Sequence, residues 1–465
     1  MKTQSNRKIG CRFLAMCMVV VLAVTGCSLP GTHTKPIKKY TPDPAETPEP
    51  SEMPVITLSE EEAMDLAGRY YEKLSTEEKV GQLFMVNLEQ LDTRKGNYYE
   101  FKKCTKTMKA ALQEIPVGGV ILFSRNISKI KQTQNLITGL QESSNTPLFV
   151  AVDEEGGDVA RIASNPKMKT TVFPSAEEIG KTQNGDYVYD MGRTIAKEIR
   201  SLGFNVDFAP VADVKTSDLN TEIGNRSFGS DPEKVAVMVS AFVQGCQEKG
   251  VSATLKHFPG QGASDGDTHQ ENVDIDRSIT KLRKTDFVPF QAGIKSGADF
   301  VMVSHISVSR VTETQEPASL SELVMRTILR DELGFRGLIV TDALDMSSIV
   351  DNYTAAEAAY QSFKAGADVI LMPANLQEAY QSLLAHVQDG SISEDRLKES
   401  VIRVLAAKLK RGILKKEQVE TYLSPSPTPE ITPTPEPTET PKPGKKSGRS
   451  RKKSDQSGKQ TVAPE

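Results

Sequence analysis

The sequence of 465 residues has no tryptophan and only five cysteines and five histidines. Three cysteines, Cys11, Cys17 and Cys27, lie near the N-terminus, which leaves Cys104 and Cys246 for a folded region. This distribution excludes a disulfide framework, although it does not decide whether Cys104 and Cys246 pair. The charge is nearly balanced, with a formal net charge of −4 at pH 7, so no field of one sign indicates nucleic acid as a partner.

The N-terminus carries an apolar segment, from Phe13 to Val24, that is too short to span a membrane comfortably. Lys and Arg residues precede it, as in a signal peptide. The segment ends in Val24-Thr25-Gly26-Cys27, which resembles the lipobox of bacterial lipoproteins. We therefore predict a signal peptide over residues 1–26 and a lipid on Cys27, which anchors the protein to the outer face of the cell membrane. An uncleaved anchor helix is the alternative, and it leaves the chain on the same side.

Two segments rich in Pro, Thr and Glu flank the central part of the chain. Residues 27–57 contain Thr47-Pro48-Glu49-Pro50, and residues 424–465 alternate Pro with Thr, Ser and Glu before a basic cluster at 445–453. Such composition predicts an extended linker at the first position and a disordered tail at the second. The basic cluster either contacts anionic wall polymers or lipid headgroups, or only keeps the tail soluble.

Between these tails, residues 58–423 contain eight short apolar runs. The runs cover residues 80–86, 119–123, 148–152, 206–211, 251–255, 300–303, 338–340 and 368–372. Helix signals separate them, such as the capping box Ser75-x-x-Glu78 and the periodic segment 231–249, which ends at Gly250. Fully apolar strands that alternate with helices predict a parallel sheet, and eight of them predict a single (β/α)8 TIM-type barrel. A doubly wound open sheet fits less well, because no Gly-x-Gly-x-x-Gly follows the first strand.

Polar residues follow several of these runs directly. They are Asp153 after the third run, Asp213 after the fourth, Lys256 and His257 after the fifth, His305 after the sixth and Asp342 after the seventh. In a parallel barrel all of these positions lie on the carboxyl-terminal rim, where catalytic groups collect. Strand ends are often polar only because they are wet, but a Lys-His pair reached directly from an apolar run is costly there without partners.

The segment Lys256-His257-Phe258-Pro259-Gly260-Gln261-Gly262, followed by Asp267-Thr268-His269, carries the most chemistry. Asp267 and His269 are two residues apart in a glycine-rich loop, and a carboxylate beside an imidazole favours the protonated ring and fixes its tautomer. A purely structural Asp–His contact is the alternative. A zinc site built from His257, His269 and His305 is a further one, although their spacing matches no metal template.

These residues resemble family 3 glycoside hydrolases, and among them the β-N-acetylglucosaminidase branch. The similarity covers residues 74–414, and residues 328–342 look like the family signature, which ends in Thr341-Asp342. The resemblance implies that Asp342 is the nucleophile, that His269 is the general acid/base and that Asp267 is the partner of His269. It also implies substrate binding by Asp153, Arg161, Arg226, Lys256 and His257, with no metal or organic cofactor.

Two positions depart from the branch, which usually has His in place of Gln261 and Arg in place of Asp158. These two departures leave the shape and the charge of the predicted pocket undecided. Many family 3 β-glucosidases take their acid/base from a second α/β domain, whereas this chain becomes Pro/Thr-rich soon after the predicted barrel. A loop histidine on the barrel itself fills that role.

The resemblance implies a retaining exo-β-N-acetylglucosaminidase that hydrolyses terminal β-N-acetylglucosamine from peptidoglycan fragments and small N-acetylglucosaminides through a covalent glycosyl-aspartate. The partners expected are this carbohydrate and, through the lipid, a membrane; no nucleic acid and no obligate protein partner are expected. The alternatives are a β-glucosidase or β-xylosidase, an N-acetylglucosaminide phosphorylase of the same family, and a non-catalytic lipoprotein that binds wall sugars.

Overall fold

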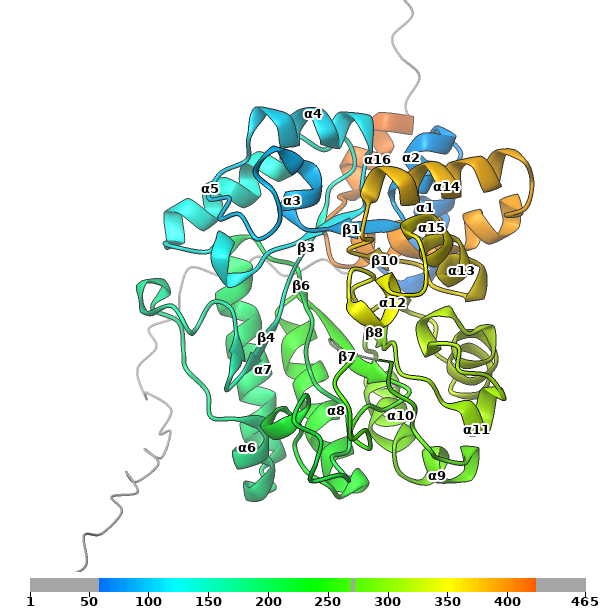
Figure 1. Cartoon of the computed structure of the whole chain (residues 1–465). Helices are drawn as coiled ribbons and strands as arrows, with labels where there is room; N and C mark the ends of the chain where they lie inside the picture. Colours follow the sequence, from blue (N-terminus) through cyan, green and yellow to red (C-terminus); the bar gives the residue numbers. More distant parts are fainter. Residues whose placement is uncertain (1–57, 269–271, 424–465) are drawn as a thin grey trace, which may run out of the picture. The chain divides into compact units, whose positions relative to one another are not determined.

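The structure, a computed structural model, describes residues 58–268 and 272–423. The predicted signal peptide, Cys27, the linker, His269 and the C-terminal tail therefore lie outside the described residues. Within the described part the chain forms a parallel barrel surrounded by helices, which confirms the predicted fold (Figure 1).

Eight parallel strands form the barrel, in the order β10-β1-β2-β3-β6-β7-β8-β9. A parallel bridge between Val340 and Val369 joins β9 to the start of β10 and closes the ring. The strands are β1 (Phe84–Val86), β2 (Gly119–Ile121), β3 (Phe149–Val152), β6 (Val206–Asp207), β7 (Ser252–Phe258), β8 (Phe300–Val303), β9 (Leu338–Thr341) and β10 (Ile370–Leu371). Each of the eight predicted apolar runs contains or overlaps one of these strands.

The helices cover the outside of this ring (Figure 1). The longer ones are α1 (Glu60–Tyr71), α4 (Lys106–Glu114), α5 (Ile130–Gln141), α7 (Gly185–Leu202), α8 (Pro232–Glu248), α10 (Phe287–Lys295), η6 (Leu323–Glu332), α13 (Ala355–Ala365), α14 (Leu376–Gln388) and α15 (Glu394–Lys410). The shorter ones are α2 (Thr76–Gly81), α3 (Leu88–Leu91), α6 (Ala176–Thr182), α9 (Ile279–Lys284), α11 (Ser309–Thr312), α12 (Ser347–Val350) and α16 (Lys416–Leu423). Single turns are η1 (Thr93–Lys95), η2 (Ser124–Asn126), η3 (Pro166–Met168), η4 (Gly224–Arg226) and η5 (Ala318–Leu320).

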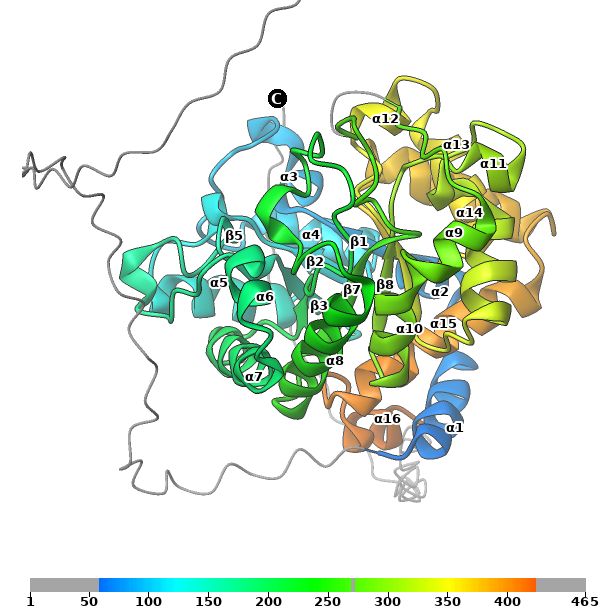
Figure 2. The same cartoon turned by 90° about the horizontal axis from the view of Figure 1, so that it is seen from below.

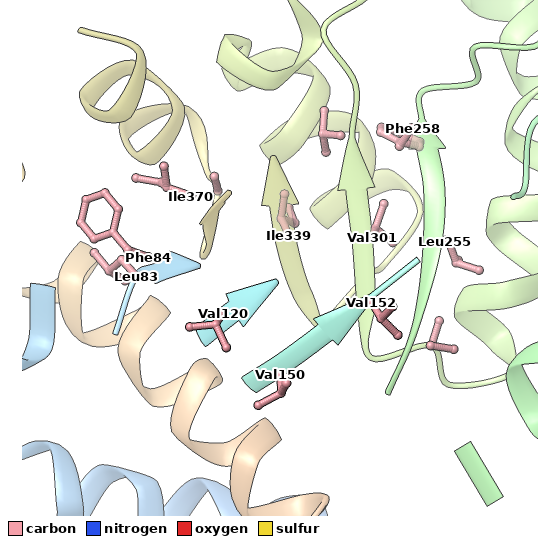
Figure 3. Packing of buried hydrophobic residues seen from close by; sticks show 14 of the residues in the cluster. Leu83, Phe84, Val120, Val150, Val152, Leu255, Phe258, Val301, Ile339 and Ile370 are labelled. Atoms are coloured by element: carbon pink, nitrogen blue, oxygen red, sulfur yellow. The ribbon is translucent and has the colours of Figure 1, made fainter. Parts of the chain in front are cut away.

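Both faces of the strands are buried, in two separate apolar layers. Along β3, Val150 and Val152 belong to the layer between barrel and helices, whereas Phe149 and Ala151 belong to a second cluster. Figure 3 shows side chains of the first layer on several strands. Because successive side chains of a strand point to opposite faces, the second cluster fills the inside of the barrel. This two-sided burial explains why the runs are apolar without alternation.

Lys408 of α15 is an exception in this apolar interior. Its side chain is fully buried, its Nζ donates a hydrogen bond to Gln82 Oε1 at 2.7 Å, and the same atom lies 5.1 Å from the centre of the Phe149 ring. Burial lowers the pKa of Lys408 to about 7. The charged form of this lysine is therefore disfavoured at neutral pH.

Both helix signals that the sequence predicted, the capping box at Ser75 and the helix that ends at Gly250, are confirmed. Ser75 and Glu78 form the capping box of α2, and Asp231 caps α8, which is followed by Gly250 in a left-handed conformation with φ of 76°. Cys104 and Cys246 are both free thiols, so they do not pair. Within the described residues, no helix is long and apolar enough to cross a membrane.

The first and last described helices lie side by side (Figure 2). The rings of Tyr70 on α1 and Tyr422 on α16 pack edge to face, with centroids 5.0 Å apart. Helix α1 also packs on α15, so residues far apart in the sequence form one corner of the molecule.

Candidate active site

A cavity of about 940 Å³ opens at the carboxyl ends of the barrel strands. Its lining includes Asp153 after β3, Lys256 and His257 at the end of β7, and Asp342 after β9. Arg161 and Arg226 line it as well. The structure thus brings together six of the predicted site residues, which come from parts of the chain up to 189 residues apart (342 − 153).

An ionic cluster forms one side of this cavity. Lys256 Nζ lies 2.8 Å from Asp153 Oδ1 and 2.7 Å from Glu155 Oε1. Arg226 binds the same Glu155 with both ends of its guanidinium, through Nε to Oε2 at 2.9 Å and Nη2 to Oε1 at 2.8 Å. Arg161 lies further out, with Nε 3.9 Å from Asp153 Oδ2. Side chains that are fixed in this way present a rigid set of donors and acceptors to a ligand.

The charges in this cluster stabilise one another. Burial alone would raise the pKa of Glu155, but the charges of Lys256 and Arg226 outweigh burial and lower it well below its usual range. Burial would lower the pKa of Lys256, and the carboxylates of Asp153 and Glu155 raise it instead. Glu155 and Lys256 therefore both stay ionised across the neutral range.

His257 lies between a third carboxylate, that of Asp213, and Arg226 of the cluster. The buried Asp213 Oδ2 accepts from both the backbone N–H of His257 at 3.1 Å and its Nδ1 at 2.7 Å. On the other side of the ring, Arg226 Nη2 lies 3.4 Å from Nε2. A proton on Nδ1 satisfies both contacts, because Nε2 then accepts from Arg226.

A short hairpin positions Asp153 and Glu155. It consists of β4 (Glu154–Gly156) and β5 (Val159–Ala160), which the sequence patterns did not reveal. Between the two cavity residues, Glu154 points into the protein and accepts from the backbone N–H groups of Ile162 and Ala163. Burial raises the pKa of Glu154 to about 7 in spite of these bonds.

Asp342 lies on the other side of the cavity from this hairpin, at the end of β9. Its backbone N–H donates to the Val303 carbonyl at 2.8 Å, which continues the pairing of β9 with β8. Its Oδ1 accepts from the backbone N–H of Ala343 at 2.8 Å. His305 supports the same turn, because its Nε2 donates to the Ala343 carbonyl at 2.9 Å.

The loop that follows β7 carries Asp267, and Glu222, which lies outside this loop, holds it in place. Glu222, which lines the cavity, accepts from the Thr268 backbone N–H at 2.9 Å and from the Thr268 hydroxyl at 2.7 Å. Gln261 Nε2 donates to the same hydroxyl oxygen at 3.3 Å. Thr268 is thus buried and fixed between the predicted pair Asp267 and His269, of which His269 lies outside the described residues.

The glycines of this loop serve the fold. A Cβ on Gly262 would lie 2.2 Å from the Val214 carbonyl oxygen, so only glycine fits there, and Gly260 has a φ of 117°. Gly262 therefore lets two backbone segments meet. Among residues 58–268 and 272–423, no group of three or more His, Cys, Asp or Glu side chains is arranged to hold a metal.

The pattern of the "Glycosyl hydrolase family 3 N terminal domain" matches residues 75–407. The chain belongs to glycosyl hydrolase family 3. This confirms the resemblance seen in the sequence and places Asp342, the β4–β5 hairpin and the loop after β7 within the matched region.

Named relatives of this family 3 chain are hexosaminidases. It is 34% identical over 378 residues to "Beta-hexosaminidase A" of Pseudoalteromonas piscicida, with 72% of this chain and 61% of that protein covered, so it spans less than two thirds of that relative. It is 36% identical over 267 residues to "Beta-hexosaminidase" of Stenotrophomonas maltophilia, with 56% and 77% covered.

Solved structures of the family share the fold. A family 3 β-N-acetylglucosaminidase from Paenibacillus sp. FPU-7 has a TM-score of 0.68 and 33% identity, with 75% of this chain and 68% of that one covered. A structure described as a beta-glucoside phosphorylase has a TM-score of 0.67 and 27% identity, covering 78% and 65%.

Three residues of the site were not among the predicted site residues. Glu155 is central to the ionic cluster, Asp213 fixes His257, and Glu222 holds Thr268. The sequence placed Asp213 on the rim, because it follows an apolar run, but gave it no role in the site. The two departures from the branch lie apart from the ionic cluster: Gln261 is buried against Thr268, and Asp158 accepts from Asn225 Nδ2 at 2.7 Å near the surface.

Proposed function

We propose that this protein is a retaining exo-β-N-acetylglucosaminidase that removes terminal β-linked N-acetylglucosamine from glycans. The observation that carries the proposal is the position of Asp342 in the same cavity as the Asp153–Lys256–Glu155–Arg226 cluster. A carboxylate opposite a rigid polar cluster is the arrangement that a sugar-binding nucleophile needs. The names of the hexosaminidase relatives support the choice of sugar.

In the proposed reaction, Asp342 attacks the anomeric carbon while protonated His269 gives its proton to the leaving oxygen. The bond from the anomeric carbon to the leaving group breaks, and a glycosyl ester of Asp342 forms. Neutral His269 then takes a proton from water, whose oxygen attacks the same carbon and releases Asp342. Two inversions give net retention. Asp267 keeps the imidazole oriented, and an imidazole avoids a second negative charge beside the nucleophile.

The ionic cluster would hold the non-reducing sugar. Asp153 accepts from sugar hydroxyls, whereas Lys256, Arg161 and Arg226 donate to them. Because the carboxylates of Glu155 and Asp153 offset the charges of Arg226 and Lys256, the cluster binds a neutral sugar without leaving either buried cation uncompensated. Cell-wall fragments and small N-acetylglucosaminides both present such a terminal sugar and differ in the sugar that leaves.

A panel of 4-nitrophenyl β-glycosides tests the proposal. We expect turnover of the N-acetylglucosaminide and much slower turnover of the glucoside and xyloside. Asp342→Ala should abolish turnover and leave the melting temperature nearly unchanged. In the wild type, mass spectrometry after reaction with a slow fluorosugar substrate should find one sugar esterified to Asp342. Equal rates for wild type and Asp342→Ala would refute the assignment.

Phosphorolysis is a second candidate, because a structural neighbour is described as a beta-glucoside phosphorylase. In that reaction phosphate replaces water at the glycosyl-Asp342 ester, and a neutral histidine repels phosphate less than a carboxylate does. Formation of N-acetylglucosamine 1-phosphate on addition of phosphate would decide for it. A product that is free sugar at all phosphate concentrations would decide for hydrolysis.

We also propose that Cys27 carries a lipid that holds the enzyme on the outer face of the cell membrane. The lipobox-like Val24-Thr25-Gly26-Cys27 supports this location. Labelling of the wild type, but not of Cys27→Ala, by a palmitate analogue in cells would test it.

A further inference from the structure

The cavity extends well beyond the ionic cluster. Past Asp342 it continues between the ends of β1, β2 and β10, where its lining includes Glu89, Tyr98, Phe123, Arg125 and Asp345. The elements of this part, β1, α3 and β10, lie above the barrel centre in Figure 1, and β4, β6 and β7 lie below it. A volume of about 940 Å³ is near the upper end for pockets that hold drug-sized ligands, so one terminal sugar leaves much of it empty.

Arg125 is the fixed centre of this second region. Its Nε lies 2.5 Å from Glu89 Oε1, and its guanidinium carbon lies 4.3 Å from the Phe123 ring centre and 5.5 Å from that of Tyr98. Glu89 is 5% exposed, so its charge and that of Arg125 offset each other inside the protein. The pair therefore forms a fixed part of the cavity wall, with the guanidinium in contact with two aromatic rings.

Tyr98 lies at the rim of this region in a strained backbone conformation. It is 80% exposed and has a φ of 61°, a conformation that non-glycine residues rarely adopt. Its neighbour Tyr99 packs on Phe101, with ring centres 4.7 Å apart, and does not line the cavity. An exposed ring beside a sugar-sized space offers an apolar face for the C–H side of a pyranose.

The charge of the region is unfavourable for anions. Among the described residues past Asp342 that line the cavity, the acidic ones are Glu89, Glu114 and Asp345, and the basic one is Arg125. Glu89 already neutralises that arginine. A ligand carboxylate would meet more negative than positive charge here, and like charges brought together discriminate strongly between ligands.

We propose that the region between Tyr98, Arg125 and Asp345 binds the sugar that leaves, and that it selects an uncharged or cationic amino sugar over one that carries a carboxylate. This inference rests on the proposed function, which fixes the terminal sugar at the ionic cluster and its anomeric carbon at Asp342. The group attached to that carbon then occupies the remaining space. Arg125 donates to its hydroxyl or acetamide oxygens, Asp345 accepts from its hydroxyls, and Tyr98 packs on its ring.

Three substrates with the same terminal sugar test the selection in the wild-type protein. They are N-acetylglucosaminyl-β-1,4-N-acetylglucosamine, N-acetylglucosaminyl-β-1,4-N-acetylmuramic acid and N-acetylglucosaminyl β-fluoride, whose leaving group needs no subsite. We expect kcat/KM for the neutral disaccharide to exceed that for the muramic acid disaccharide by about tenfold, a difference that salt reduces because charge repulsion causes it.

Two variants locate the selection. Glu89→Gln keeps the shape of the side chain and frees the charge of Arg125, so kcat/KM for the muramic acid disaccharide should rise about tenfold. Tyr98→Ala should raise KM for the neutral disaccharide about fivefold, while the matched control Tyr99→Ala leaves it unchanged. Both variants should keep the wild-type rate with the fluoride, which shows that fold and nucleophile are intact.

The outcomes separate the two proposals. If no N-acetylglucosaminide is turned over, the proposed function itself fails. If the disaccharides are turned over but the muramic acid substrate equals or exceeds the neutral one, the selection is wrong. If Tyr98→Ala lowers the rates with fluoride and disaccharide equally, the region serves the terminal sugar, and its assignment to the leaving sugar is overturned.

Discussion

Glu155 and Arg226 form a two-bond ion pair inside the cavity, with Oε2 and Oε1 2.9 and 2.8 Å from Nε and Nη2. The pair connects the β4–β5 hairpin to the loop that also carries Glu222, and Lys256 adds a third bond to the same carboxylate. One carboxylate thus holds two of the three cations that the proposed mechanism uses to grip the sugar.

Glu155→Gln should therefore damage substrate binding more than stability. The amide keeps the size of the side chain but cannot balance two buried cations, and we expect kcat/KM to fall by about 100-fold, a loss typical of breaking a buried charged pair. Kinetics with a nitrophenyl N-acetylglucosaminide would measure it. Glu177→Gln, which changes a half-buried surface glutamate paired with Lys181, is the control. A loss below threefold for Glu155→Gln would show that the ion pair does not set the binding geometry.

Asp213→Asn should affect both stability and activity. Three donors converge on this buried carboxylate, from the His257 N–H and Nδ1 and from the Gln261 N–H at 2.6 Å. An asparagine replaces one acceptor oxygen by an NH₂ group, so at least one donor is left unpaired at a cost of about 1–3 kcal/mol. Urea denaturation measures the loss. Unchanged stability together with unchanged kcat/KM would mean that His257 does not depend on Asp213.

Glu222 and Thr268 should act as one unit. Glu222→Ala removes both bonds that fix the loop beside Asp267, and Thr268→Val removes the bond from the hydroxyl but keeps the one from the backbone N–H. We expect Glu222→Ala to lower kcat/KM about tenfold for a nitrophenyl substrate and Thr268→Val to lower it less. Because the hydroxyl bond is already lost in Glu222→Ala, the double variant should be scarcely worse than that single variant. With the glycosyl fluoride, which needs no proton from an acid, the losses should disappear. Additive losses, or equal losses with the fluoride, would argue for a general defect of folding.

Lys408 should make stability depend on pH in the alkaline range. Its pKa is lowered to about 7 in the folded protein, whereas an unfolded lysine titrates near 10.4. Between these values the unfolded chain binds one more proton than the folded protein, so the free energy of unfolding rises with pH. Below about pH 7 both states are protonated, and the cost of burying the charged lysine does not change with pH.

Lys408→Met should remove this dependence. We expect the stability difference between variant and wild type to shrink by on the order of 3 kcal/mol from pH 7 to pH 9.5. Denaturation at several pH values measures it, with Lys398→Met, a half-buried surface lysine of the same helix that pairs with Glu72, as control. A difference that is the same at both pH values would show that Lys408 stays charged when buried.

The sequence sufficed for the barrel because both faces of its strands are buried. Runs such as 300–303 and 338–340 agree with β8 and β9 to within a residue. The ends of β1 and β10 were predicted less well: residues 80–81 belong to α2, and Asp368 precedes β10 because its buried carboxylate pairs with Arg330 and Arg403. An apolar run shows burial but does not show where strand pairing begins.

The site was predictable in part for a related reason. Residues at the end of a strand or directly after it, such as Asp153, Lys256 and Asp342, can be placed on the rim by counting strands. Glu155 and Glu222 cannot, because their positions depend on a hairpin and a loop whose course is set by tertiary contacts. Neither Glu155 beside Glu154 nor Glu222 in a polar loop carries a local signal that separates it from its neighbours.

The contact between Tyr70 and Tyr422 has a consequence for engineering. Tyr70 contacts Tyr422 and Glu62 lies near Lys416, so α1 and α16 run in the same direction and residues 60 and 423 lie at opposite ends of the pair. A linker that spans the 12 residues of α1, roughly 18 Å, could join them, and new ends could be cut into an exposed turn far from the cavity. Such a circular permutant would retain the ring of strands, and a fusion partner placed at its relocated ends would approach the barrel from a different side.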